Sequence, residues 1–348
     1  MSFQVTLQPS GHSFEVAENE FVLDAAMRHA IDLPYGCRNG VCASCAATLL
    51  SGEVSYLRKP DALSASMQHN NQALLCMAIP ISDLVIQTDE FDEMTLPVKK
   101  LRCRLEQKQK LSHDVMLIKI KIAGAERLQY HAGQYVEFIL EDGRRRAFSL
   151  ANAPHADSLL ELHVRHVNGG FFTDYLFDLM PDKSMLRVEG PLGQFYLREN
   201  TNRPIILMGG GTGFGPIKAI VEHILHTGIK QKMYLFMGVR ALRDLYMQPW
   251  TSEWTGKHPE IMFTPVLSEP LPEDNWQGAT GYVHTEVQRQ FKDLSGFDIY
   301  MSGPPPMVTA AVAAFETQGA TREHMYSDAF EYSTDALRAI SQSGAEQK

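Results

Sequence analysis

Hydrophobic and polar positions alternate differently in successive parts of the chain. Near the N-terminus, alternation predicts strands at residues 3–7 and 13–16 around the turn Pro9-Ser10-Gly11. Residues 21–30 have helical spacing, with Asn19 as the candidate N-cap. Further strands are expected near 46–50 and at 81–88. Strands wrapped around one helix predict a small α+β unit.

The pattern changes twice further along the chain. From about 99 to 199, short β segments separated by turns such as Glu141-Asp142-Gly143 predict an antiparallel barrel, with one helix at 171–180. After about 200, strands alternate with helical segments, which predicts a parallel sheet. These elements are the strands 205–208, 234–239 and 297–301 and the helix 216–227.

The predicted fold class is therefore multi-domain: an α+β domain, an antiparallel β-barrel domain and an α/β parallel-sheet domain. Residues 89–98 are acidic and contain a proline, which is typical of a linker. We expect the α+β domain at 1–92, the linker at 93–98, the barrel at 99–199, the α/β domain at 200–332 and a polar tail at 333–348.

Charge is distributed unevenly over the 348 residues, whose net charge is −9. Residues 1–92 contain 11 acidic and 4 basic side chains, a balance of −7, and the remaining 30 acidic and 28 basic side chains give −2. No basic stretch indicates a nucleic-acid binder. Two interpretations of the acidic first part stay open: an ordinary solvated surface, or a docking face that steers a basic partner.

The N-terminal sequence MSFQVTLQPSGHSFEVAENE has neither the basic region nor the apolar core of a signal peptide. No run of about 18 apolar residues predicts a membrane span. We therefore expect a cytoplasmic protein with no membrane association.

Four of the five cysteines follow a distinctive spacing. Cys37-x4-Cys42-x2-Cys45 is followed, after 30 intervening residues, by Cys76, which matches the spacing of plant-type [2Fe-2S] centres. A zinc site would show a second C-x2-C pair or paired histidines, and disulfides are not expected without an export signal. We expect these four cysteines to bind the cluster and Cys103 to be a buried structural thiol.

The segment PYGCRNGVCASC, residues 34–45, resembles the plant-type ferredoxins. That resemblance implies a complete ferredoxin domain with the beta-grasp fold over residues 1–92.

The predicted strand at Arg146-Ala147-Phe148-Ser149 resembles the Arg-x-aromatic-Ser motif of the ferredoxin–NADP reductase superfamily. The resemblance implies that Arg146 holds a flavin pyrophosphate, that Phe148 lies against the isoalloxazine and that Ser149 hydrogen-bonds near its N5. The family more often has tyrosine in place of Phe148. Taken alone, the motif also fits a plain strand end.

A second segment extends this resemblance. His163-Val164-Arg165 precedes a turn and a helix that begins near Gly170, Phe172 and Thr173. The resemblance places this helix N-terminus against the cofactor phosphates, a favourable position for an anion. The alternative is a helix capped by Thr173 and packed by Phe172. The resemblance also implies that His163 and Val164 contact the cofactor. It implies FAD rather than FMN as that cofactor, because the family prefers FAD.

A glycine-rich turn follows the strand 205–208 and opens a helix. It resembles the GGGTGxxP turn of the same superfamily, which implies a nucleotide pyrophosphate against Gly210, Gly211, Thr212 and Gly213, and Pro216 suits the first helical position. Arg240 and Asp244 follow the next strand, where ribose selectivity lies. We expect NADH, with NADPH as the alternative, and Asp244 fits a helix cap equally well.

The segment Ser302-Gly303-Pro304-Pro305-Pro306-Met307 resembles the CGPPPM loop that faces the nicotinamide, with Ser302 in place of cysteine. Gly303, Pro304 and Met307 are implied cofactor contacts. Phe330 is expected either to shield the flavin or to fill the core. Ser149 and Ser302 are the catalytic candidates.

Together the motifs resemble NAD(P)H-dependent reductases that carry FAD and one [2Fe-2S] cluster. The resemblance implies hydride transfer from NADH to FAD, then single electrons to the cluster and on to a redox protein. That acceptor would be an oxygenase component or a deoxysugar dehydratase, docked near the acidic ferredoxin domain of a monomeric chain. The alternative is a flavin or quinone reductase that acts on small acceptors without a dedicated partner.

Overall fold

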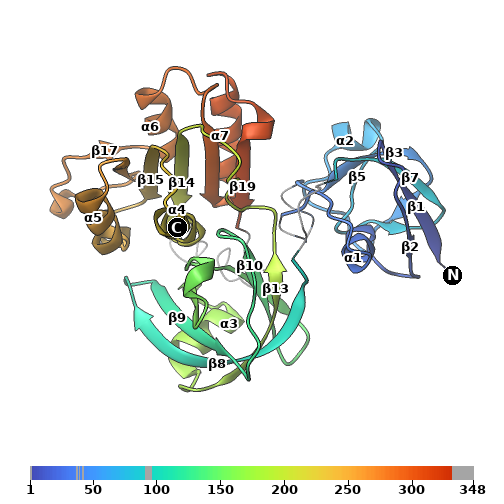
Figure 1. Cartoon of the computed structure of the whole chain (residues 1–348), viewed down its shortest axis with the longest axis horizontal. Coiled ribbons are helices and arrows are strands. Elements are labelled where there is room, and N and C mark those ends of the chain that lie inside the picture. The colour runs from blue at the N-terminus through green and yellow to red at the C-terminus, as the bar shows by residue number, and fades with distance from the viewer. Residues whose placement is uncertain (1, 37, 39, 41–42, 91–95, 331–348) are drawn as a thin grey trace, which may run out of the picture. The chain divides into compact units, whose positions relative to one another are not determined.

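The computed structural model describes residues 2–36, 38, 40, 43–90 and 96–330 (Figure 1). It divides into two compact units, residues 1–96 and 97–348. In the part of the chain that the structure describes, no helix combines the length and the hydropathy needed to cross a membrane.

The first unit is built on a five-stranded sheet with strand order β2-β1-β7-β3-β5. The pair β1–β7 is parallel and the other pairs are antiparallel. A small second sheet pairs β4 with β6. The elements are β1 Phe3–Gln8, β2 Ser13–Val16, α1 Val22–Arg28, β3 Ala46–Ser51, β4 Val54–Ser55, α2 Ala65–His69, β5 Gln72–Leu74, β6 Ile79–Pro80 and β7 Leu84–Gln87.

Alternation in β1 explains how this unit forms its core. Val5 and Leu7 are fully buried, while the intervening side chains face outward, and α1 buries Val22 and Leu23 against the same core. The predicted N-cap is wrong: α1 begins at Val22 with Phe21 as its N-cap. Asn19 instead takes a left-handed conformation in the preceding turn.

The second unit begins with an antiparallel barrel of strand order β11-β10-β13-β8-β9-β12. A bridge between Leu150 and Leu162 joins the end of β11 to β12 and closes the sheet. The predicted helix at 171–180 is a short α-helix continued by a π-turn. The elements are β8 Lys99–Lys110, β9 Val115–Ile122, β10 Tyr135–Ile139, β11 Arg145–Ser149, η1 Pro154–Ala156, β12 Leu160–Arg165, α3 Phe171–Asp174, η2 Tyr175–Leu179 and β13 Met185–Leu192.

A six-stranded sheet of order β17-β16-β15-β14-β18-β19 follows, and every pair in it is parallel. Its elements are β14 Ile205–Gly210, η3 Gly211–Gly213, α4 Phe214–Thr227, β15 Met233–Val239, η4 Leu242–Asp244, α5 Gln248–Lys257, β16 Ile261–Leu267, η5 Pro272–Asp274, β17 Ala279–Thr280, α6 Val283–Gln290, β18 Asp298–Gly303, α7 Pro305–Glu316, η6 Arg322–His324 and β19 Met325–Ala329. The helix α4 begins two residues before Pro216, so this proline occupies its third position rather than its first. Proline is tolerated there because the first N–H groups of a helix have no partner within it.

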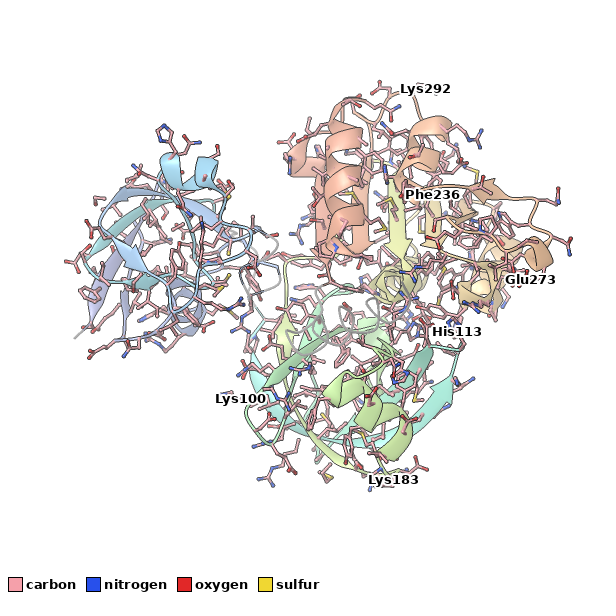
Figure 2. The ribbon with its side chains drawn as sticks, turned by 180° about the vertical axis from the view of Figure 1, so that it is seen from behind. Lys100, His113, Lys183, Phe236, Glu273 and Lys292 are labelled. Atoms are coloured by element: carbon pink, nitrogen blue, oxygen red, sulfur yellow. The ribbon has the colours of Figure 1, made fainter. Side chains whose placement is uncertain are left out.

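Both faces of this sheet are buried, which is why its strands are almost continuously apolar. Side chains of β14 alternate between two clusters: Ile205 and Leu207 pack with α4 and α5, whereas Ile206 and Met208 pack with α6 and α7. The side-chain view places the buried Phe236 among these elements and Lys100 and Lys183 on the barrel surface (Figure 2).

The barrel and the parallel sheet share one hydrophobic cluster. Ala132 and Phe195 of the barrel pack with Ile217 and Ile220 of α4. The helix α4 therefore lies between the sheet that it belongs to and the barrel.

Gly52 gives a test of the packing in the first unit. Its φ is +90°, and an added Cβ would lie 2.1 Å from the carbonyl oxygen of Asp83. We expect Gly52→Ala to destabilise the unit by roughly 3 kcal/mol, because backbone must move, and to lower the midpoint of thermal unfolding followed by circular dichroism. The control is Gly11→Ala, which has φ +78° and open space around the new Cβ, so it should cost only about 1 kcal/mol. Equal effects of the two changes would contradict the packing.

Candidate cofactor sites

Two of the four predicted cluster cysteines lie together in the first unit. Cys45 and Cys76 are both buried, and the backbone N–H of Leu75 donates to the Cys45 carbonyl at 3.1 Å. Cys37 and Cys42 lie outside the described residues. Thiolates from two adjacent segments are the donor set that a [2Fe-2S] cluster needs, so the described residues fit that group.

Gly40, which lies in sequence between the first two cysteines, packs tightly against the segment that carries Cys76. Gly40 has φ +85°, and an added Cβ would lie 2.2 Å from Sδ of Met77 and 2.9 Å from Cβ of Pro60. Only glycine fits at this position without displacing its neighbours.

Tyr56 lies beside the same cysteines. Burial, and then the negative charge of Cys45 and Cys76 as thiolates, raises the pKa of Tyr56, and its hydroxyl accepts a hydrogen bond from the N–H of Leu74 at 3.2 Å. The next residue, Leu57, is 79% exposed. An uncovered apolar side chain therefore follows directly on Tyr56, which packs against the hydrophobic cluster that contains both cysteines.

Cys103 lies in β8 and is fully buried, which confirms the prediction of a buried thiol. Burial raises the pKa of Cys103 to about 12. The thiol is therefore protonated and unreactive at neutral pH.

The predicted flavin motif lies on β11 at one edge of the barrel. Arg146, Phe148 and Ser149 are half-buried, and Ala147 is exposed. The Phe148 ring packs against Phe172, with 5.6 Å between the ring centroids, so the structure brings the two halves of the motif together.

Sequence reasoning missed Asp328, a carboxylate at this edge of the barrel. The Ser149 hydroxyl donates to Asp328 Oδ2 at 3.2 Å, although the two residues are 179 positions apart. Asp328 lies on β19, two residues before Phe330, whose N–H donates to the Gly303 carbonyl at 2.8 Å. No local pattern in the sequence indicated that Asp328 would reach Ser149, because the contact depends on how β19 packs.

Gly170 and Thr173 form a compact turn at the start of α3. The Thr173 hydroxyl donates to the Val167 carbonyl at 2.9 Å and accepts from the Val167 N–H at 3.2 Å. Phe172 is buried in the barrel core. Phe172 thus has the packing contact of the alternative interpretation, but the Thr173 cap is wrong: Gly170 is the N-cap of α3, no side chain caps the helix, and the Thr173 hydroxyl bonds to the preceding turn. The cofactor contacts of both residues stay predictions.

His163 and Val164 point into the protein interior. Val164 is fully buried in the barrel, and the His163 ring contacts Glu161 Oε1 and the Tyr246 hydroxyl, both at 3.2 Å. Burial lowers the pKa of His163, although the adjacent Glu161 carboxylate opposes that shift. The ring is therefore neutral at physiological pH and occupied by these two partners, and its predicted cofactor contact is untested.

The glycine turn brings together two segments that the sequence identified separately. An added Cβ on Gly210 would lie 2.6 Å from Sδ of Met307 and 3.0 Å from Pro304, and one on Gly213 would lie 2.2 Å from the Ser302 carbonyl oxygen. The end of β14 and the turn that follows it therefore lie so close to the end of β18 and the start of α7 that a side chain at either glycine would displace its neighbours.

This turn opens the 14-residue helix α4, whose N-terminus favours an anion. Thr212 is half-buried at its start. A second residue that sequence reasoning missed adds positive charge: an added Cβ on Gly211 would lie 3.0 Å from Nη1 of Arg165. The Arg165 side chain is held there by Asp114, whose Oδ2 accepts from Nε at 2.8 Å.

Ser302 is fully buried, and its hydroxyl has no hydrogen-bond partner among the described residues. A buried hydroxyl without a partner is costly in a folded protein. A polar ligand beside the glycine turn, such as a nicotinamide amide, would supply the partner, so the residues fit that group.

Arg240 and Asp244 differ in exposure. Arg240 is exposed at the end of β15, whereas Asp244 is buried and accepts from the Ala241 N–H through Oδ2 at 3.0 Å. Its other oxygen lies 3.6 Å from Nδ1 of His113 on the barrel. The structure thus confirms the cap proposed as one alternative for Asp244, and a ribose contact stays a prediction.

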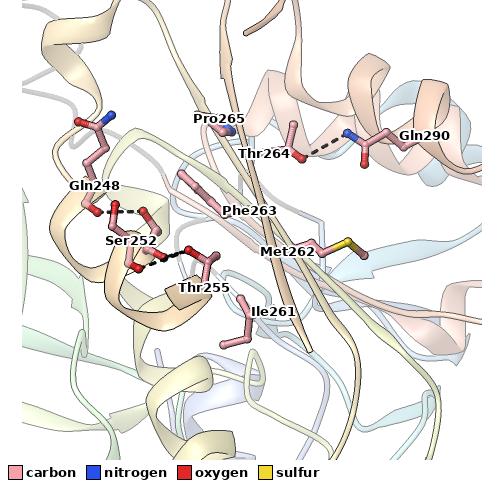
Figure 3. A pocket seen from close by; sticks show the side chains of 10 residues that line it. Gln248, Ser252, Thr255, Ile261, Met262, Phe263, Thr264, Pro265 and Gln290 are labelled. Carbon is pink, nitrogen blue, oxygen red and sulfur yellow. Dashed lines mark hydrogen bonds between the residues drawn. The ribbon is translucent and has the colours of Figure 1, made fainter. Parts of the chain in front are cut away.

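A separate pocket of about 560 Å³ lies between α5, β16 and the end of α6 (Figure 3). Its lining includes hydroxyl side chains such as Ser252 and Thr255, and the Gln290 amide donates to the Thr264 hydroxyl at 3.2 Å. None of the residues predicted from the motifs lines it.

These sites define a class of protein: a redox protein in which a cysteine-ligated cluster domain is joined to a flavin barrel and a nucleotide-binding sheet. Family models match in that order. Residues 5–80 match a 2Fe-2S iron-sulfur cluster binding domain, residues 102–196 an oxidoreductase FAD-binding domain and residues 207–313 an oxidoreductase NAD-binding domain.

Relatives match along nearly the whole chain. The CDP-6-deoxy-L-threo-D-glycero-4-hexulose-3-dehydrase reductase of Yersinia pestis is 35% identical over 95% of this chain and 99% of its own. The phenol hydroxylase P5 protein of Acinetobacter pittii is 31% identical over 99% and 98%. The crystal structure of the Amycolatopsis cytochrome P450 reductase GcoB is 32% identical, with a TM-score of 0.81 over 94% of this chain and 98% of that one.

The chain therefore belongs to the family of iron–sulfur flavoprotein reductases within the ferredoxin–NADP reductase superfamily. It is an NAD(P)H-dependent oxidoreductase whose cofactors are FAD and a [2Fe-2S] cluster, as its motifs predicted.

Proposed function

We propose that this reductase oxidises NADH and delivers electrons from its cluster to a separate redox protein, an oxygenase component or a deoxysugar dehydratase. The observation that carries the proposal is the combination, in one chain, of the buried Cys45 and Cys76 with a flavin motif and a glycine turn. The relatives named for a hexulose dehydrase, a phenol hydroxylase and a cytochrome P450 support a protein acceptor.

When bound, FAD would supply the hydride acceptor for the nicotinamide and the one-electron donor for the [2Fe-2S] cluster, which holds one electron at a time. The chain's residues bind and orient these groups. On the flavin side, Arg146 pairs with the pyrophosphate through its guanidinium, and Phe148 presents its ring to the isoalloxazine. The Ser149 hydroxyl, which donates to Asp328 Oδ2 at 3.2 Å, would be held by that carboxylate near the flavin N5.

On the nucleotide side, the N-terminus of α4 and the Arg165 guanidinium supply positive potential beside Gly211. The dinucleotide pyrophosphate binds there. The Ser302 hydroxyl donates to the nicotinamide amide, which satisfies a buried group that has no partner among the described residues. Arg240, exposed after β15, contacts the adenosine ribose. Phe330 excludes water from the flavin face.

The acceptor protein is proposed to dock on the first unit. Residues 1–92 carry an excess of seven acidic charges, which attract a basic partner over a distance of about 10 Å at moderate ionic strength. Leu57, 79% exposed beside the cysteine site, offers an apolar contact at the place where electrons leave.

Anaerobic titration with NADH tests the electron path. We expect flavin bleaching together with a rhombic [2Fe-2S] signal in low-temperature electron paramagnetic resonance, at about one cluster per chain. Cys76→Ser should abolish that signal and leave the bleaching, because it removes one thiolate ligand. The control Cys103→Ala, at the buried thiol of the barrel, should keep both signals. Bleaching without a cluster signal in the unmodified protein would overturn the proposal and favour a simple flavin reductase.

Ser302→Ala separates a binding role from a packing role. Loss of the buried hydroxyl should leave the melting temperature unchanged or slightly raised, because an unsatisfied group is removed. Hydride transfer measured by stopped-flow bleaching should slow about tenfold, because one hydrogen bond to the nicotinamide is lost. An unchanged bleaching rate at every NADH concentration would show that Ser302 does not contact the nicotinamide.

Leu57→Ser tests the docking site with cytochrome c as a basic protein acceptor and ferricyanide as a small one. We expect NADH-driven cytochrome c reduction to fall about fivefold and to weaken further with added salt, while ferricyanide reduction stays constant. The control is Leu50→Ser, at the opposite end of β3 from Cys45 and 52% exposed, which should have no effect. An equal loss in both variants would refute docking at Leu57.

A further inference from the structure

Lys218 is a buried cation at the seam, which is the region where the barrel packs against α4 of the parallel-sheet part. It lies on α4, is 3% exposed and uses all three of its ammonium protons. Its Nζ donates to the Ala151 carbonyl at 2.9 Å, and it lies 3.0 Å from Glu161 Oε1 and 2.8 Å from Glu222 Oε1. Ala151 and Glu161 belong to the barrel, so the cation joins the two parts of the second unit.

The network continues from Glu161 back to the sheet. The same carboxylate oxygen that faces Lys218 lies 3.2 Å from His163 Nε2, and the other nitrogen of that ring contacts the Tyr246 hydroxyl at 3.2 Å. Glu161 and His163 are two residues apart on β12 and so point to the same side. Lys218 and Tyr246 come from the α/β part, and thus each barrel residue is held by a residue from across the seam.

The contact between Lys218 and Glu161 is ionic, unlike the apolar packing that also joins the barrel to the parallel sheet. Burial opposes ionisation of Glu161, but the His163 hydrogen bond and the Lys218 charge outweigh it and lower the pKa of Glu161 to about 2. Apolar packing already joins the two parts through Ala132, Phe195 and Ile220. A buried ion pair adds little net stability compared with apolar packing, but it tolerates only arrangements in which both charges stay paired.

The network lies between the two motifs that hold the cofactors. Ala151 is two residues after Ser149 of the flavin motif, and Lys218 is five residues after Gly213 of the glycine turn. Between them, α4 approaches the barrel closely: an added Cβ on Gly215 would lie 3.5 Å from Cβ of Ala151. The ammonium group thus connects the end of the flavin strand to the first turns of the nucleotide helix.

We propose that the Lys218–Glu161 pair is a positioning device that fixes α4 and its glycine turn on the barrel, so that the nicotinamide is held in line with the flavin. Lys218 touches neither cofactor and acts through the helix. The inference rests on the flavin and nucleotide sites of the proposed function. Reactions between two bound groups are sensitive to this alignment, because a displacement of about 1 Å can cost a factor of about 100 in rate.

The test compares Lys218→Met with the double variant Lys218→Met/Glu161→Gln in the full-length holoprotein. The single change removes the lysine that pairs with both Glu161 and Glu222 and leaves Glu161 with only Lys119, 3.5 Å from its Oε2, as a cationic partner. It should lower both the melting temperature and the rate of flavin reduction. The double change removes the Lys218–Glu161 pair and leaves Glu222, whose side chain is 26% exposed, to be solvated. It should restore the melting temperature to within a few degrees. Flavin reduction at saturating NADH should nevertheless stay at least about tenfold slower than in the unmodified protein, with the dissociation constant of NADH changed less than about threefold.

Two further measurements report positioning directly. With NADH deuterated at the transferred position, the isotope effect on bleaching should rise in the double variant, because hydride transfer becomes more rate-limiting. In flavin-free protein, backbone amides of α4 should exchange hydrogen faster than in the unmodified chain. The matched control is Lys257→Met, which removes an exposed lysine paired with Glu253 on α5 and should change none of these quantities.

The proposal is wrong if the double variant regains the reduction rate together with the melting temperature, because the pair would then serve stability alone. It is also wrong if α4 exchanges hydrogen at the unmodified rate. If the unmodified protein fails to reduce its flavin with NADH, the proposed function fails instead. The exchange measurement in flavin-free protein still decides then whether Lys218 fixes the helix.

Discussion

Close approach of two backbone segments governs the nucleotide-binding part of this reductase. At the end of β14 and in the turn after it, Gly213 faces the Ser302 carbonyl at the end of β18 and Gly210 faces the Met307 side chain of α7, at distances where a side chain on either glycine would displace its neighbour. Because Gly213 lies against the Ser302 carbonyl, the start of α4 and residue Ser302 are close together at the nucleotide site. The buried face of α4 packs against the barrel, so the position of this helix depends on both parts of the second unit.

Much of the fold follows from local signals in the sequence. Alternation around Val5 and Leu7 gives the first sheet, and the continuous apolar strand 205–208 before a glycine turn indicates a buried parallel strand. The cysteine spacing was equally informative, since four thiolates at fixed intervals have few other uses. Each of these signals is local, so it can be recognised without knowing how distant segments pack.

Features that depend on distant contacts were not predictable. Asp328 meets Ser149 only because β19 joins the sheet beside β18, and Arg165 reaches Gly211 only because the barrel packs on α4. A lysine in a helix is ordinarily exposed, so nothing in the sequence indicated that Lys218 is buried. The N-cap prediction for the first helix was wrong for a related reason. Asparagine is a residue type that often caps helices, but Asn19 has a left-handed backbone and lies in a turn.

The burial of Cys103 has a practical consequence. Its thiol is fully enclosed and its pKa is near 12, so it does not compete for alkylating or disulfide reagents in the folded protein. The other four cysteines are those expected to hold iron. Any sulfhydryl that reacts in a native sample would therefore count chains that have lost their metal, and a simple colorimetric assay becomes a gauge of cofactor occupancy.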